Sequence, residues 1–245
     1  MCKFKSGLIL KDRVFIPDYD SHSDMLDELK IDDTRANAER LFIRAELYPK
    51  DDDVFSDIDT WVFNVDQDIK PEWFVEEVDK ERMITAVKEW AKNHIYIGVN
   101  GLKIEGGKEY YIKDCKNVKI INSTVEAWDN STVKACGNST VEAWDNSTVK
   151  AWDNSTVKAC GNSTVKAWDN STVKACGNST VKACGNSTVK AWDNSTVEAW
   201  DNSTVVKAQY SSFKQSNLIL SENATFKDCK AKVIYQSGDW ELRSV

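Results

Sequence analysis

The chain has 245 residues, of which 41% are hydrophobic, a length that suits two modest domains. Its formal net charge is −7, and the acidic excess lies in residues 1–122, which hold 19 basic and 26 acidic side chains. The remainder is nearly neutral, so the composition argues against nucleic acid as a direct ligand, because phosphate binding needs clustered Lys and Arg.

Cysteine and hydrophobic patterning restrict the cellular setting. Seven Cys in 245 residues are too sparse for a disulfide scaffold. The apolar run Leu8–Leu10 near the start is too short for a signal peptide, and no stretch approaches the roughly 20 apolar residues that span a membrane. We therefore expect a cytoplasmic protein in reducing surroundings, with no membrane partner.

The first part of the chain, residues 1–105, predicts a small α+β domain. The expected elements, in chain order, are a hairpin (4–17), a short helix (21–29), a helical piece (33–40), two strands (41–47 and 61–65) and one long helix (71–93). Ser21 or Ser23 can cap the short helix, and Pro71 stands where the first turn of the long helix favours proline. Apolar positions that can pack this helix on a sheet are Phe74, Val78, Val87, Trp90 and Ala91.

Few side chains in this domain suggest chemistry. Asp18, Asp20, His22 and Asp24 alternate and could ligate a metal, but a turn followed by an acidic helix start explains them as well. The acidic stretch Asp51–Asp59 lacks the spacing of a calcium loop, and His94 fits a partner of a helix end. We predict no catalytic residue, no metal and no cofactor, hence no enzyme.

An eight-residue unit, Asn-Ser-Thr-Val-Lys/Glu-Ala-Trp/Cys-Asp/Gly, repeats over residues 122–205. Ser, Val and Ala alternate with Thr and Lys/Glu, which is the period of a strand with one apolar face. Asn with Asp or Gly is turn chemistry, and one unit cannot bury its own face. Residues 106–245 are therefore expected to form a parallel β-solenoid (β-helix), with Ser, Val and Ala inside and Asn laddered at the corners.

The number of units in one coil is left open between two and three. The small inward set favours a two-sided coil of sixteen residues. The residue at the Trp/Cys position instead agrees best between units that are three apart. A coil of 24 residues would stack Cys136, Cys160 and Cys184 in one column. The exchange itself indicates a corner position with partly exposed, stacked indoles.

The solenoid is expected to begin near Tyr110 in degenerate form. Val118-Lys119-Ile120 before Asn122 resembles a unit that is one residue short. Residues 206–245 are expected to form degenerate capping coils, with Phe213 and Phe226 at core positions, because a bare solenoid end is an open strand edge.

Two resemblances bear on function. Lys3-Phe4-Lys5, Leu10–Phe15, Pro17–His22 and Trp73–Glu77 resemble a group of uncharacterised proteins from bacterial and phage genomes, over roughly the first 120 residues. The array resembles, in architecture only, pentapeptide-repeat proteins, some of which mimic DNA, and the octad-based ice-nucleation proteins. Ice-nucleation repeats present Thr-x-Thr, whereas the outward pair here is Thr132 and Lys134 and their equivalents.

The sequence thus predicts a non-enzymatic structural or binding protein. A rigid solenoid would serve as a spacer or display surface, and the N-terminal domain would dock a protein partner or a second copy of the chain. The candidate binding surface comprises Trp128, Trp144, Trp152, Trp168, Trp192, Trp200, Lys134, Lys158 and Lys182. The alternatives are a phage-type inhibitor that mimics a nucleic acid, an ice-binding solenoid, and an enzyme with its site in the N-terminal domain.

Overall fold

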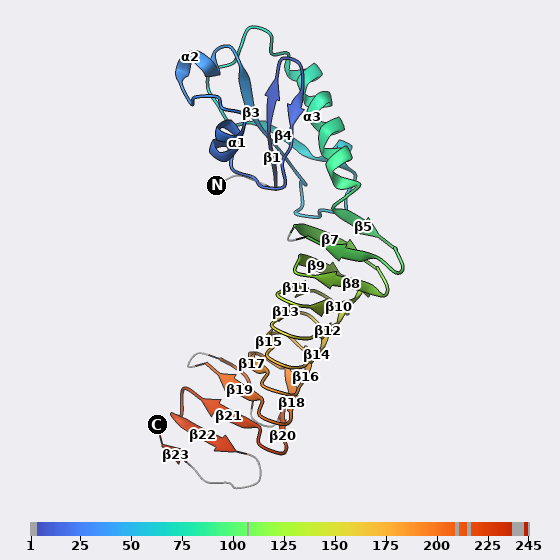
Figure 1. Cartoon of the computed structure of the whole chain (residues 1–245), viewed down its shortest axis with the longest axis vertical. Coiled ribbons are helices and arrows are strands. Elements are labelled where there is room, and N and C mark those ends of the chain that lie inside the picture. Colours follow the sequence, from blue (N-terminus) through green and yellow to red (C-terminus); the bar gives the residue numbers. More distant parts are fainter. Residues whose placement is uncertain (1–3, 107, 209–210, 215–216, 237–242, 245) are drawn as a thin grey trace. The chain divides into compact units, whose positions relative to one another are not determined.

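The computed structural model describes residues 4–106, 108–208, 211–214, 217–236 and 243–244. The chain divides into two compact units, Met1–Ile95 and Tyr96–Val245, each with its own hydrophobic core. The first unit is α+β and the second is a parallel β-solenoid, so the predicted fold class is confirmed (Figure 1).

A four-stranded antiparallel sheet forms the centre of the first unit. Its strand order is β2-β1-β3-β4. The strands are β1 (Lys5–Leu10), β2 (Val14–Phe15), β3 (Phe42–Tyr48) and β4 (Val62–Val65). β1 and β2 are the predicted hairpin. Leu8 and Leu10 of β1 face one hydrophobic cluster and Ile9 faces another, so the sheet is buried on both sides.

Helices cover the two faces of this sheet. The helical elements are α1 (His22–Glu28), α2 (Arg35–Ala38), the short 3-10 helix η1 (Ile58–Thr60) and α3 (Glu76–Ala91). Met25 and Leu26 of α1 share a cluster with Leu8, whereas Met83 and Val87 of α3 pack with Ile9. Ser21 caps α1 as predicted, by accepting a hydrogen bond from the Asp24 amide.

The long helix starts later than the sequence indicates. Pro71 begins a turn, in which the Phe74 amide bonds the Pro71 carbonyl at 3.0 Å. α3 begins at Glu76, and the Asp79 carboxylate accepts a hydrogen bond from the Val75 amide at 2.9 Å, which satisfies one of the open donors at this helix end. The expectation that Val78 packs on the sheet is also wrong, since it is 57% exposed.

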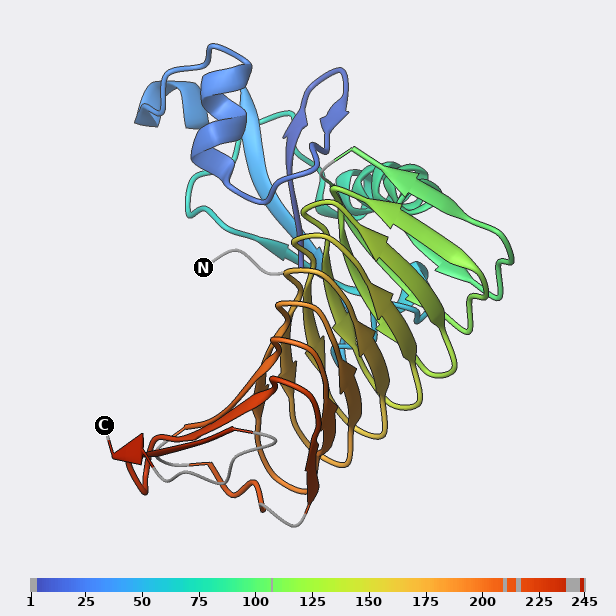
Figure 2. The ribbon, with the colours of Figure 1, turned by 60° about the horizontal axis from the view of Figure 1, so that its bottom comes forward.

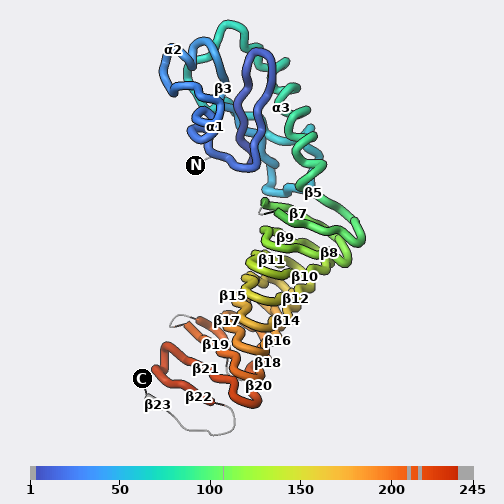
Figure 3. The backbone as a smooth tube through the Cα atoms, in the orientation of Figure 1, coloured from blue at the N-terminus to red at the C-terminus, as the bar shows by residue number. Residues whose placement is uncertain are grey.

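The solenoid consists of two sheets, and successive parallel strands along the chain enter one sheet and then the other (Figures 2 and 3). Among the described residues, the eight-stranded sheet contains β6 (Lys103–Glu105), β8 (Val118–Ile121), β10 (Thr132–Cys136), β12 (Thr148–Ala151), β14 (Thr164–Ala167), β16 (Thr180–Ala183), β18 (Thr196–Ala199) and β20 (Leu218–Leu220). The eleven-stranded sheet contains β5 (Ile95–Ile97), β7 (Glu109–Lys113), β9 (Thr124–Trp128), β11 (Thr140–Ala143), β13 (Thr156–Ala159), β15 (Thr172–Ala175), β17 (Thr188–Ala191), β19 (Thr204–Lys207), β21 (Thr225–Asp228), β22 (Val233–Gln236) and β23 (Arg243–Ser244).

Strand register decides the coil size. Val133 pairs with Val149 and Val149 with Val165, so equivalent residues in neighbouring coils are two octads apart. One coil therefore holds two strands, one in each sheet, as the small inward side chains favour. The octad before the regular array is one residue short, as predicted, because Val118 pairs with Val133.

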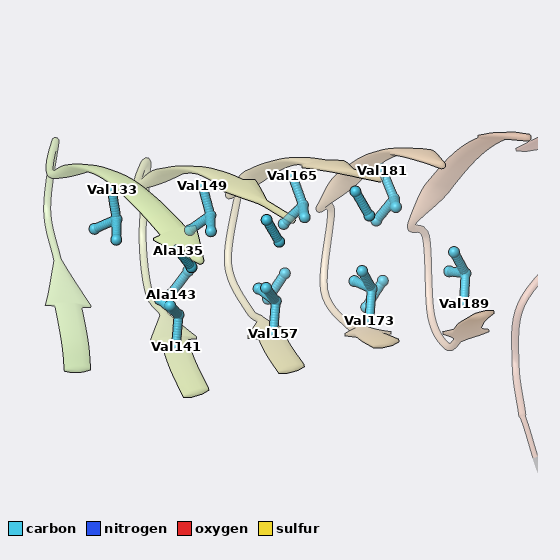
Figure 4. Packing of buried hydrophobic residues seen from close by; sticks show 14 of the residues in the cluster. Val133, Ala135, Val141, Ala143, Val149, Val157, Val165, Val173, Val181 and Val189 are labelled. Atoms are coloured by element: carbon cyan, nitrogen blue, oxygen red, sulfur yellow. The ribbon is translucent and has the colours of Figure 1, made fainter. Parts of the chain in front are cut away.

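The solenoid core consists of small side chains in straight columns. Figure 4 shows Val and Ala from both sheets pointing at one another between the layers. Val133 to Val205 in the array are fully buried, and the Ala and Ser residues of the same units are equally buried. The predicted inward set of Ser, Val and Ala is thus confirmed. Inward Ser hydroxyls donate to main-chain carbonyls, as Ser163 does to Cys160 at 2.7 Å.

The last residue of every octad has a left-handed backbone. Asp169 has φ 55° and Gly185 has φ 68°, which explains why this position accepts only Asp or Gly here. Asp carboxylates also bond the turn amide one coil earlier, as Asp169 does to Asp153 at 3.2 Å. The neighbouring Asn residues form the expected corner ladder, for example Asn178 to Asn162 at 3.4 Å.

The ends of the solenoid are irregular. It begins before Tyr110, contrary to expectation, because β5 and β6 already belong to its two sheets. At the other end Phe226 pairs with Val205, and Phe213 and Phe226 are both buried, as predicted for larger closing residues. Antiparallel β22 covers the outer edge of β21. The predicted capping segment 206–245 also includes residues outside the described ranges.

Candidate functional site

Three rows of side chains cover each outer face of the solenoid. In every regular strand the outward residues are Thr, then Lys or Glu, then Trp or Cys at the turn. In-register pairing repeats each of these positions in the next coil of the same sheet. Neighbouring parallel strands lie about 4.8 Å apart, so each row is a straight array of closely spaced side chains.

From β6 to β16 the middle row of the eight-stranded sheet is made of lysine, and Glu198 of β18 continues it. In-register pairs join six of them in sequence, which we call the lysine row: Lys103, Lys119, Lys134, Lys150, Lys166 and Lys182. At about 5 Å apart in water, two neighbouring ammonium groups repel by roughly 0.8 kcal/mol. Like charges directly opposite destabilise a sheet, so this row has an unfavourable electrostatic energy in the isolated protein.

Acidic partners meet only the ends of this row within the described part of the chain. Lys103 pairs with Glu105 and Lys182 with Glu198, both at 2.8 Å. The four inner lysines make no ion pair with any described residue. The acidic residues of the array nearly balance its lysines in the total charge, but the coil places the members of the lysine row on one face.

The middle row of the eleven-stranded sheet is mixed. From β7 to β17 its members are Tyr111, Glu126, Glu142, Lys158, Lys174 and Lys190. Lys158 pairs with Glu142 at 2.8 Å, and this hydrogen bond raises the pKa of Lys158. Burial, reinforced by the Glu109 charge, raises the pKa of Glu126. The two faces therefore share their Thr rows but differ in charge.

The indoles form two columns at the opposite corners of the coil. Trp152, Trp168 and Trp200 follow strands of the eight-stranded sheet, and Trp128, Trp144 and Trp192 follow strands of the other. Trp152 stacks on Trp168 with ring centroids 5.0 Å apart, and Trp128 stacks on Trp144 at 5.3 Å. All six are partly exposed, so the predicted corner position is confirmed.

The predicted surface residues are consequently split between the two sides. The structure brings Lys134 and Lys182 together with Trp152, Trp168 and Trp200. Lys158 lies on the other sheet, with its ammonium 5.0 Å from the Trp144 ring. Sequence reasoning missed the lysine row, although comparing octads two apart would have revealed it.

Two cysteines interrupt one indole column side by side. The sulfur atoms of Cys160 and Cys176 lie 2.7 Å apart in neighbouring coils, and burial raises the pKa of Cys160 to about 12. Because a coil holds two strands, Cys136 and Cys184 belong to the opposite corner, separated by Trp152 and Trp168. The column of Cys136, Cys160 and Cys184 that a three-sided coil would give does not form.

The alternating acids of the first unit do not converge on one site. Asp20 bonds the buried Lys5 ammonium at 2.8 Å, and Asp18 lies 2.9 Å from His94. His22 contacts the Ala45 carbonyl at 3.2 Å. Asp18, Asp20 and His22 thus serve different structural contacts, and the described residues contain no cluster of three or more acidic, His or Cys side chains able to hold a metal.

The loop acids and His94 also have local partners. Asp53 accepts a hydrogen bond from the Phe55 amide, and Asp57 accepts one from the Asp59 amide at the start of η1. His94 follows the end of α3, where its Nδ1 lies 2.8 Å from the Trp90 carbonyl. This geometry matches the expected role of His94 at a helix end.

An open groove of about 820 Å³ lies between the β1–β2 turn and α3. Its lining residues are Asp12, Arg13, Val14, Glu77, Val78, Glu81, Arg82, Thr85, Ala86 and Glu89. Arg82 is engaged by Asp79 and the Leu10 carbonyl, so the α3 wall of the groove is acidic beside the exposed Val78, while Arg13 of the β1–β2 turn is the other basic lining residue.

No known protein family, curated protein or solved structure matches this chain. Within the described ranges, no helix is long and apolar enough to cross a membrane.

Proposed function

We propose that the protein is a non-enzymatic scaffold. The solenoid holds fixed rows of side chains, and the first unit docks a protein partner through the groove between the β1–β2 turn and α3. The observation that carries this proposal is the register of the array, in which each outward position recurs in line every sixteen residues. Such a surface is rigid because neighbouring coils make the same contacts.

The groove supports the docking role. Glu77, Glu81 and Glu89 of α3 line it together with Val78, so it offers both apolar area and negative charge. A partner segment with basic residues around an apolar anchor has the complementary chemistry. The wall is built on a sixteen-residue helix packed on the sheet, which fixes its geometry before a partner binds.

Cross-linked affinity capture with the full-length chain tests this function. We expect Glu81→Lys, in the groove, to abolish capture of a partner that the wild-type chain retains. The exposed Glu72→Lys, outside the groove and with the same change of charge, should leave it unchanged. Capture that survives Glu81→Lys, or is lost equally in both variants, contradicts docking at this groove.

The mimicry and ice-binding alternatives receive less support. A nucleic-acid mimic needs acidic columns, but the corner acids divide into two sets, Asp129, Asp145 and Asp193 at one corner and Asp153, Asp169 and Asp201 at the other. Glycines interrupt both sets. The rows beside Thr are charged rather than a second Thr row, which disfavours ice. Inhibition of a DNA-binding enzyme, or thermal hysteresis above a buffer control, would reinstate one of them.

A further inference from the structure

The lysine row is the longest run of like charges among the in-register strands that the structure describes. Its six lysines stand on neighbouring strands about 4.8 Å apart and extend over about 24 Å of one sheet. Its four inner members form no ion pair with a described residue, although the pKa of Glu105, lowered first by its hydrogen bond with Lys103, is also lowered by the charge of Lys119. A chain of regularly spaced anions laid along this row would relieve the repulsion between the lysines.

The neighbouring rows indicate the kind of anion. On one side of Lys150 and Lys166 stand Thr148 and Thr164, whose hydroxyls can donate hydrogen bonds. On the other side stand Trp152 and Trp168, which stack on each other at 5.0 Å. A line of cations between hydroxyls and aromatic rings suits a polymer that carries both phosphates and flat bases.

The corners limit the width of the occupant. Acidic side chains follow the tryptophans at one edge, at Asp153, Asp169 and Asp201, and precede the Thr row at the other, at Asp129 and Asp145. The positively charged surface between these acidic corners is therefore only as wide as one short strand is long, roughly 13 Å for four residues. A duplex or an anionic lipid surface would extend over the acidic corners, whereas a single strand fits between them.

We propose that the lysine row binds single-stranded nucleic acid independently of sequence. Phosphates lie along the lysines, and bases turn towards the tryptophan column. At the roughly 3.4 Å per phosphate of a helical strand, the row accommodates about seven phosphates, and fewer when the strand is extended. This role is independent of the groove in the first unit.

The test is fluorescence anisotropy of the full-length chain with a labelled oligothymidylate of about 15 nucleotides. The variant combines Lys134→Gln, Lys150→Gln and Lys166→Gln. The matched control combines Lys158→Gln, Lys174→Gln and Lys190→Gln, which removes the same charges from the same octad position on the other sheet. Thermal melts check that both variants remain folded.

We expect the first variant to weaken binding on the order of a hundredfold at about 0.05 M salt, and to lower the salt slope by about 2, since each lost phosphate contact contributes about 0.7. The control should change affinity by less than about threefold, because its charges lie on the far sheet. Trp168→Ala should weaken binding about fivefold or more, and its counterpart Trp144→Ala should not.

Three results would overturn the proposal. One is no binding by the wild-type chain at low salt. Another is an equal loss in the two lysine variants, which would indicate non-specific attraction. The third is tighter binding of duplex DNA, an acidic peptide or phosphatidylserine vesicles than of the single strand, which would assign the row to that other class of anion.

Discussion

The two faces of the solenoid are built from the same octad, yet they differ in charge. Both carry a Thr row and a corner column of Trp and Cys, and both bury the same Val and Ala. One middle row is lysine over six neighbouring strands, from Lys103 to Lys182, whereas the other contains Glu126 and Glu142 before Lys158. In a two-strand coil, odd and even octads never share a face, so substitutions in alternate units change one surface and spare the other.

Deletion of octads should give the largest effect. Removing residues 138–153 takes out one coil and should change the melting temperature by only a few degrees, because neighbours meet the same interface. Removing residues 138–145 moves every later octad to the opposite sheet and misplaces the capping residues Phe213 and Phe226. Exposing these rings should cost at least about 5 kcal/mol, or about 10–20 °C in a thermal melt.

A deletion of residues 138–161 supplies the control for loss of length. It removes one and a half coils, so we expect damage like that of the eight-residue deletion. Equal damage from all three deletions would contradict a coil of two strands, and harmless removal of 24 residues alone would indicate three.

Substitutions at the last position of the octad show which residues the left-handed turn tolerates. Asp169 has φ 55° and accepts a hydrogen bond from the Asp153 amide at 3.2 Å. Asp169→Ala should destabilise the protein by about 2 kcal/mol, because Ala lacks both the hydrogen bond to the Asp153 amide and the polar side chain that lets Asp adopt a left-handed backbone. Asp169→Gly also loses the hydrogen bond but removes the Cβ that disfavours this backbone, so it should cost about 1 kcal/mol less, as urea unfolding can measure. Equal losses would mean that backbone strain is not what restricts this position.

Much of the solenoid could be predicted because its rules are local. The period of two in Ser-Thr-Val-Lys-Ala assigns the inward residues, and Asn beside Asp or Gly marks the turns. Those two patterns correctly gave the core columns from Val133 to Val205 and the Asn ladder. Because the octads are so regular, a correct interpretation of one octad predicts the structure of the others.

What could not be predicted depends on longer-range choices. The lysine row can be recognised only once the coil size is known. The Trp/Cys pattern, which matches best at a spacing of three units, points to the wrong coil size. In the first unit, Pro71 fits a helix start, but the turn through Phe74 and the cap by Asp79 delay α3 to Glu76. The groove beside Val78 likewise forms from segments far apart in sequence.

Glu126 and Glu142, the two acids of the mixed row on the eleven-stranded sheet, should have small and opposite effects on stability. Burial and Glu109 raise the pKa of Glu126, so the folded state favours its protonated form; the associated stability is present at acidic pH and lost as pH rises through the raised pKa. Glu126→Gln should therefore raise the melting temperature at neutral pH by about 1–3 °C and have no effect below the ordinary carboxyl range.

Glu142→Gln serves as the opposite control. It breaks the 2.8 Å pair with Lys158, so we expect a slight loss of stability at neutral pH, of less than about 1 kcal/mol at this surface site. A stabilising effect of both substitutions would show that the row is destabilised by its acids as a whole.

The coil size itself, from which both faces follow, is tested most directly by mapping disulfides after mild oxidation. Oxidised glutathione can accept two electrons from two protein thiols, forming one protein disulfide and two molecules of reduced glutathione. Since burial raises the pKa of Cys160 to about 12, the reaction should accelerate as pH rises. Mass spectrometry of the digested chain should then find Cys160 joined to Cys176, whose sulfurs lie 2.7 Å apart. A link from Cys160 to Cys136 or Cys184 in the monomer would instead contradict the two-strand coil.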